Sequence, residues 1–190
     1  MFRNKLMSLL SCGFARREDG SVAIEAVIIL PMMFWTFLSL FSIFDAFSQY
    51  GANQKAAYTL GDMISRETVP IDDRYLDGAQ DLFDYLTRSP QESSIRVSML
   101  RYSGSTNTFS VFWSKSRGWN PPLTTADVKK WDTRLPKMPD KEYVLVTETW
   151  AKYVPPFKTG LEKSTIQNFV FTRPRYATCV LWVTMESNGC

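Results

Sequence analysis

An apolar run near the N-terminus constrains this chain more than any other feature of its sequence. The run extends over the 24 residues from Ser21 to Phe44 and contains one charged residue, Glu25; the next charge is Asp45. At a rise of about 1.5 Å per residue, a helix of this length crosses a hydrocarbon core of about 30 Å. A soluble chain of 190 residues has no core large enough to bury a helix that is apolar on every side. The run therefore predicts a transmembrane helix.

The charges on either side of the run predict its orientation. Only Lys55 follows the run within twenty residues, whereas four basic residues precede it: Arg3, Lys5, Arg16 and Arg17. The positive-inside rule then places the N-terminus in the cytoplasm and the rest of the chain outside. A removable secretory signal is the alternative, but its apolar region would be about 7–15 residues long and would end in a small-x-small site. This run is longer, and it ends in Ile43-Phe44-Asp45-Ala46.

Two of the three cysteines, Cys179 and Cys190, fall in the part of the chain predicted to be exported. An oxidising compartment favours a disulfide between them. The short loop that it closes would stabilise the fold by about 2–3 kcal/mol on the chain-entropy model. In the alternative interpretation, Cys179 is a small buried strand residue and Cys190 is a terminal thiol. The sequence leaves both interpretations open.

The composition argues against most catalytic sites. The chain has no histidine, which excludes Ser-His-Asp and Cys-His triads and histidine-ligated zinc. A net charge of +3 is too small to indicate a nucleic-acid binder. The aspartates at 72, 73, 81 and 84 do not follow the EF-hand pattern, and we interpret them as helix-capping and solvated residues. We therefore expect no enzyme activity, no catalytic residue, no metal and no cofactor.

The rest of the chain predicts a small α+β domain. The apolar stripe of the first helix continues to about Arg66, and a second helix begins after Asp72 or Asp73 and ends at Ser89-Pro90. Alternating apolar and polar residues predict an antiparallel sheet of about five strands. The expected strands lie at 95–99, 109–113, 143–150, 165–172 and 177–184, with a short helix at 124–132 and thus two or three helices in all.

The most specific motif is Gly20-Ser21-Val22-Ala23-Ile24-Glu25, which follows a polar leader and opens the apolar run. It resembles the processing site of type IV prepilins, where a membrane-embedded aspartic peptidase cuts after the glycine and a glutamate stands fifth in the mature chain. With Ser21 as the first mature residue, Glu25 is the fifth. The longer run GSVAIEAVIILPMMF resembles the TadE-like proteins of the tight-adherence (Tad, Flp) pilus system. The segments 154–157 (VPPF) and 169–177 (FVFTRPRYA) add to this resemblance.

Two departures from the family pattern refine the resemblance. Major Flp pilins carry an aromatic residue after the glutamate, whereas this chain has Ala26. Major pilins are also tiny, whereas this chain has a large predicted head. Both departures favour a minor pilin, or pseudopilin, over the major fibre subunit.

The resemblance implies a role for each residue near the cleavage site. Gly20 and Ser21 flank the bond that is cut, and Glu25 pairs with the new α-amino group of Ser21 on a neighbouring subunit and so sets the register. In the alternative interpretation, Glu25 is an interfacial acid that faces lipid headgroups. Pro31 removes one backbone hydrogen bond and is expected to kink the helix.

Together these expectations describe a single-pass protein of a bacterial inner membrane. Residues 1–20 form a cytoplasmic prepilin leader, 21–47 the transmembrane helix, 48–67 its continuation as a pilin-like stem, and 68–190 a periplasmic α+β head. The implied partners are the prepilin peptidase, other pilin-like subunits, the major Flp pilin, the inner-membrane assembly platform and the lipid bilayer, with no nucleic acid. The implied role is pilus assembly and surface adhesion, including biofilm formation. The alternative is an uncleaved, membrane-anchored periplasmic binding or adhesion protein.

Overall fold

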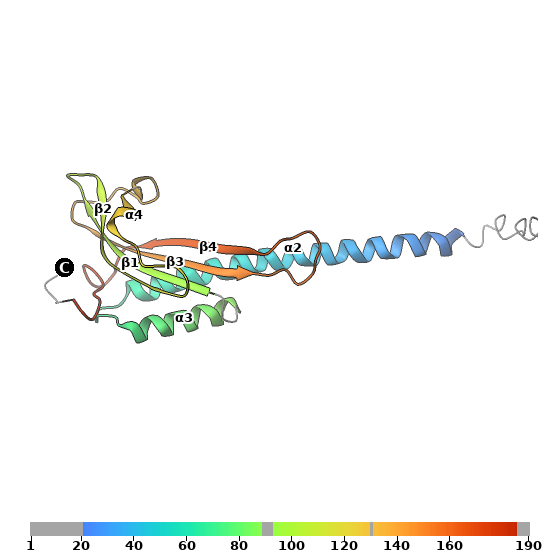
Figure 1. Ribbon diagram of the computed structural model, residues 1–190, viewed down its shortest axis with the longest axis horizontal. Helices are drawn as coiled ribbons and strands as arrows, with labels where there is room; N and C mark the ends of the chain where they lie inside the picture. Colours follow the sequence, from blue (N-terminus) through green and yellow to red (C-terminus); the bar gives the residue numbers. More distant parts are fainter. Residues whose placement is uncertain (1–20, 89–92, 130, 186–190) are drawn as a thin grey trace, which may run out of the picture. The chain divides into compact units, whose positions relative to one another are not determined.

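The computed structural model describes residues 21–88, 93–129 and 131–185 (Figure 1). These residues fall into two compact units. Residues 21–44 and 156–161 belong to the first unit, and the other described residues, from Asp45 onward, belong to the second. We describe each unit by itself.

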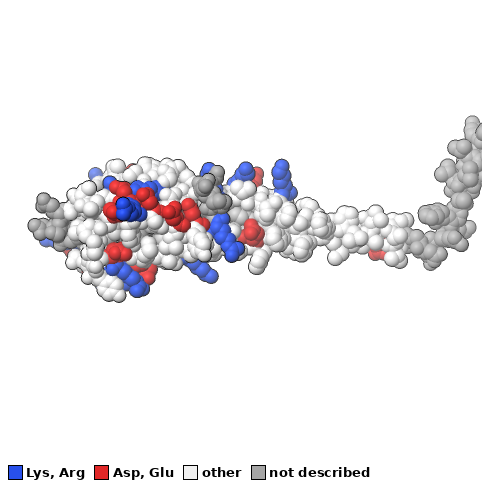
Figure 2. Space-filling view, turned by 90° about the horizontal axis from the view of Figure 1, so that it is seen from below, with Lys and Arg blue, Asp and Glu red and all other residues white. Residues whose placement is uncertain are grey.

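The first unit contains the apolar part of helix α2, which runs from Ser21 to Ser65 as one helix. Its large apolar side chains are exposed; Val22, Val27 and Phe44, for example, are 74%, 71% and 74% accessible. Figure 2 shows a long stretch almost free of charged side chains. Among the described helices, α2 is the one that is long and apolar enough to cross a membrane.

Three hydroxyl groups in the apolar part of α2 are satisfied within the helix itself. Thr36, Ser39 and Ser42 donate to the carbonyl oxygens four residues earlier, over 2.8, 3.0 and 2.9 Å. In a hydrocarbon environment an unpaired hydroxyl is costly, and hydrogen bonding to the preceding turn removes that cost. These hydroxyls are therefore compatible with a lipid-facing helix.

The second unit places two helices against a sheet. The later part of α2 buries one stripe, in which Ala57, Leu60 and Ile64 have no exposed surface. Helix α3, Asp73–Thr87, begins as predicted after Asp72, whose Oδ1 accepts the backbone N–H of Tyr75 over 2.8 Å. This hydrogen bond satisfies one of the N–H groups that a helix N-terminus leaves unpaired.

The described strands form one antiparallel sheet of four strands, in the order β2-β1-β3-β4. Their bounds are Ser93–Ser103 for β1, Thr108–Arg117 for β2, Tyr143–Tyr153 for β3 and Ser164–Thr172 for β4. The α+β class and the hairpin of the first two strands are as predicted. Strands β1 and β3 are central, and Met99 pairs with Leu145 between them.

Side chains on both faces of the sheet are buried. On one face, Ile95, Val97 and Met99 pack with α2 and α3 in the main core. On the other, Leu100 and Val144 pack beneath α4 (Thr125–Val128) and the short 3-10 helix η3 (Trp131–Thr133). The register with β2 shifts between Met99 and Leu100, because Phe112 is an extra residue in β2. This extra residue reverses the alternation of β2, so Trp113 packs in the main core and Val111 packs against the second core.

The predicted fifth strand at 177–184 is wrong. This segment follows β4 without joining the sheet, and within the described residues its one bridge joins Trp182 to Ile71 in parallel. Its apolar residues instead fill the main core: Cys179, Val180 and Trp182 are 4%, 1% and 2% exposed. A run of apolar and β-branched residues fits an irregular segment that fills a core as well as it fits a strand, so the sequence pattern alone could not exclude a strand.

Candidate functional site

The residues predicted to be processed lie at the start of α2. Ser21 is the first described residue and is helical. Gly20 lies outside the described residues, as does the whole predicted leader. The described part of the chain therefore does not test the cleavage itself.

Glu25 lies in the second turn of α2 and is exposed. It borders a shallow hollow of about 290 Å³, whose other lining residues are Val22, Ala26, Ile29 and Leu30. The small side chain of Ala26 opens this hollow between larger neighbours. Glu25 is also the only charged residue of α2 before Asp45. The site thus offers one carboxylate beside an apolar depression on an otherwise apolar helix.

Position along the helix matters for the cost of this acid. A charged side chain at the centre of a bilayer costs about 2.5–3.5 kcal/mol on insertion scales. Glu25 is four residues from Ser21, about 6 Å along the axis. If the apolar segment spans a membrane, Glu25 is close enough to the interface to reach headgroups or a nearby cation.

Pro31 and Cys179, two other residues singled out in the sequence, both lie among the described residues. Pro31 lies inside α2, which continues on both sides of it, and the expected kink stays a prediction. Cys179 is 4% exposed and disulfide-bonded. Cys190, its predicted partner, lies outside the described residues, so the pairing also stays a prediction.

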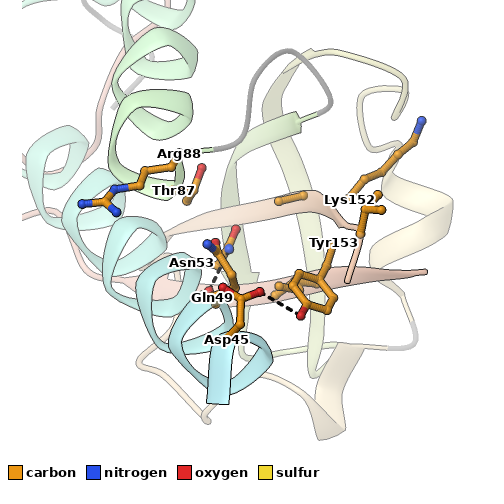
Figure 3. Close-up of a pocket in the computed structure, with 10 residues that line it drawn as sticks. Asp45, Gln49, Asn53, Thr87, Arg88, Lys152 and Tyr153 are labelled. Carbon is orange, nitrogen blue, oxygen red and sulfur yellow. Dashed lines mark hydrogen bonds between the residues drawn. The ribbon is translucent and has the colours of Figure 1, made fainter. Parts of the chain in front are cut away.

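The second unit contains a polar pocket that the sequence analysis did not predict (Figure 3). It has a volume of about 330 Å³ and is lined by α2, the end of α3 and strands β3 and β4. The side chains of Asp45 and Tyr153 point toward one another, and the Tyr153 hydroxyl donates to Asp45 Oδ2 over 3.0 Å. Burial, and then the adjacent Asp45 carboxylate, raises the pKa of Tyr153 from 10.0 to about 12. This hydrogen bond joins the end of β3 to α2.

Asn53 gives the pocket a second polar feature. It is 2% exposed, and its Nδ2 donates to the Gln49 carbonyl oxygen over 2.8 Å. Its Oδ1 has no hydrogen-bond partner among the described residues. Lys152 points away from the Asp45–Tyr153 pair (Figure 3). The lining of the pocket also includes Thr87 and Arg88 at the end of α3, so the pocket offers both hydrogen-bond donors and acceptors.

A buried ion pair lies on the sheet face covered by α4 and η3. Arg96 Nε donates to Glu148 Oε2 over 2.7 Å across paired positions of β1 and β3. Arg96 Nη1 also donates to the Pro121 carbonyl oxygen over 2.9 Å, and its guanidinium lies 5.0 Å from the centre of the Trp150 ring. Burial raises the pKa of Glu148, and Arg96 only partly opposes this effect. Because every partner is internal, we interpret the pair as structural.

No protein-family model, curated protein or solved structure matches this chain. The functional argument therefore rests on the residues and geometry of the chain itself.

Proposed function

We propose that this protein is a minor pilin-like subunit of a Tad (Flp) type IV pilus, anchored in a bacterial inner membrane and processed by a prepilin peptidase. One observation supports the proposal above the others. The apolar segment of α2 exposes its large side chains over residues 22–44 and carries one acid, Glu25, which is the fifth residue after Gly20 of the prepilin-like motif.

The continuation of α2 supports the same proposal. The helix extends past the apolar segment, and its later turns pack against the four-stranded sheet of the second unit. A pilin-like subunit needs both parts, because the apolar part holds the subunit in lipid or in a filament and the packed part holds the folded domain to it. The exposed apolar surface of residues 22–44 needs a covering that the described residues do not supply.

Glu25 has a specific role in this proposal. Cleavage before Ser21 would create an α-amino group, and the carboxylate of Glu25 would pair with that group on an adjacent subunit. In an apolar bundle an unpaired charge is strongly disfavoured, so the pair selects one register between neighbouring helices. The hollow beside Ala26 would leave room for the neighbouring chain end.

Replacement of Glu25 tests this role. We expect Glu25→Val to leave cleavage largely intact but to reduce co-purification with other pilin-like subunits at least tenfold, because the apolar side chain cannot neutralise the amine. Ile29→Val, which alters the same hollow without changing charge, is the matched control and should behave as wild type. Normal co-purification of Glu25→Val would count against the proposal.

A membrane-anchored binding protein that is not cleaved is the second candidate. The polar pocket with the unpartnered Asn53 Oδ1 favours it. In that case Glu25 has no partner amine, and Glu25→Val should change neither assembly nor surface attachment. N-terminal sequencing distinguishes the two candidates.

A further inference from the structure

The loop between β3 and β4 carries apolar side chains that are exposed to solvent. Val154, Phe157 and Leu161 are 57%, 41% and 38% accessible. The loop also carries three exposed charged residues, Lys158, Glu162 and Lys163, of which Lys158 lies within residues 156–161. Surface loops are normally polar, and a group of exposed apolar side chains marks a contact surface.

Two contacts join α2 to this loop and to the strand end that precedes it. Within the second unit, Tyr153 at the end of β3 donates to Asp45, the first residue after the apolar segment. Within the first unit, the Phe157 ring packs edge-on against Phe41, with ring centres 5.9 Å apart. Phe41 and Asp45 are one helical turn apart, about 6 Å along the axis. Residues 156–161 therefore lie beside the last turns of the apolar segment.

We propose that residues 156–161, the interfacial loop, contact the lipid bilayer at the outer membrane interface. This rests on the proposal that residues 21–44 span a membrane, because the last turns of the span then lie at the boundary between acyl chains and headgroups. Aromatic rings are enriched at this depth. Lysine side chains there extend their charge toward headgroup phosphates. Phe157 and Lys158 supply this combination on one loop.

Lipid fits this surface better than a second copy of the chain. The loop packs on the membrane-spanning segment itself, so its apolar residues continue a surface that lipid already covers. They also stand next to a cation that anionic headgroups would attract. A protein partner would have to cover the loop and displace lipid from Phe41 at the same time.

A fluorescent probe on the loop tests the proposal with the full chain. Cys12→Ser removes one cysteine, and the predicted disulfide between Cys179 and Cys190 protects the other two from labelling, which the unlabelled Cys12→Ser protein checks. Leu161→Cys then takes an environment-sensitive nitrobenzoxadiazole probe. The protein is reconstituted in phosphatidylethanolamine and phosphatidylglycerol vesicles with lipids that carry a quencher near the headgroup. Probes at Ser39→Cys, in the apolar segment, and at Ser105→Cys, in the exposed β1–β2 turn, are the matched references.

We expect the probe at 161 to be quenched at least threefold more than the probe at 105, with a blue-shifted emission. Phe157→Asp should lower quenching at 161 to the level at 105, whereas Phe157→Tyr should retain it. Equal quenching at 161 and 105, with strong quenching at 39, would overturn the loop proposal and leave the membrane span intact. Quenching at none of the three positions would overturn the span and the loop together. Energy transfer between loops that rises with the ratio of protein to lipid would overturn it in favour of a second copy.

Discussion

Glu25 and Glu148 are both glutamates in apolar surroundings, and they differ in where a positive partner can come from. Glu25 is exposed on an apolar helix, whereas Glu148 is 2% exposed inside the folded unit. Both need a positive partner, but only Glu148 has one within the described residues, the guanidinium of Arg96. The partner proposed for Glu25 belongs to another subunit.

Removal of Arg96 alone should destabilise the fold strongly. Arg96→Met leaves the Glu148 carboxylate buried without a partner, and we expect a loss of about 3–5 kcal/mol in the free energy of unfolding. Arg96→Met combined with Glu148→Met should recover most of this loss. Urea unfolding of the full chain in detergent, followed by tryptophan fluorescence, measures both. A double variant no more stable than the single one would contradict the structural role of the pair.

The same pair predicts a pH dependence. Burial raises the pKa of Glu148 above its ordinary value of 4.5, so the folded chain binds this proton more tightly than the unfolded chain. The contribution of Glu148 to stability is therefore largest below pH 4.5 and is lost as pH rises through the folded-state pKa. In Arg96→Met the pKa rises further, so this variant should lose more stability between about pH 5 and about pH 7.5 than wild type does. Equal losses would contradict the prediction.

Tyr153 should contribute one hydrogen bond that depends on alkaline pH. Tyr153→Phe removes the donor to Asp45, and we expect a loss of about 0.5–1.5 kcal/mol at neutral pH. Because the pKa is raised from 10.0 to about 12, this contribution is complete below pH 10.0 and disappears as pH rises through about 12. The difference in unfolding free energy between wild type and variant, measured across that range, checks the prediction. A difference that stays constant would contradict it.

Among the helices and strands, the sequence predicted correctly those features that depend on neighbouring residues along the chain. The start of α3 followed from Asp72, whose side chain caps the helix, and the β1–β2 hairpin followed from alternating residues around a polar turn. The segment 177–184 was predicted wrongly because its apolar residues are buried in the core without pairing in the sheet. Hydrogen bonds from Ile71 and Val183 hold it instead, and these depend on tertiary packing that no local pattern reports.

Two glycines in opposite surroundings should respond in opposite ways to replacement by alanine. Gly118 has a φ of +93°, and a Cβ there would lie 2.7 Å from the Ser93 carbonyl oxygen. Gly118→Ala should therefore destabilise the fold by about 1–3 kcal/mol. Gly78 lies inside α3 with nothing within 4 Å of an added Cβ, so Gly78→Ala should stabilise it by about 0.5–1 kcal/mol. Thermal unfolding of both variants measures the two changes in stability. Changes of the same sign would contradict the backbone conformation at Gly118 or the helical position of Gly78.

For the whole molecule, the dominant constraint is the exposed apolar segment of α2. This segment could be predicted from the sequence, because a small soluble protein can rarely bury a run of 24 residues that contains only one charge. The Asp45–Tyr153 contact and the Phe41–Phe157 contact were not readable, because each joins residues more than a hundred positions apart. The candidate processing site was predicted from its motif, whereas the proposed interfacial loop was identified only from those contacts.

A charge in the middle of the apolar segment should weaken membrane insertion. Met33→Arg should cost about 2.5–3.5 kcal/mol on insertion scales, because Met33 is near the centre of the run. Met33→Leu preserves apolar character and should insert as wild type does. The fraction of protein that resists extraction from membranes by alkaline carbonate measures the effect. Equal resistance of the two variants would contradict a membrane-spanning role for residues 21–44.

The most direct test of the proposed function is the intact mass of the protein purified from its native host. We expect the mass of a chain that begins at Ser21, because the bond after Gly20 is the one the prepilin-like motif marks for hydrolysis. The same protein from a strain that lacks the prepilin peptidase should retain residues 1–20. A mature chain that still carries these residues in the presence of the peptidase would contradict the proposal.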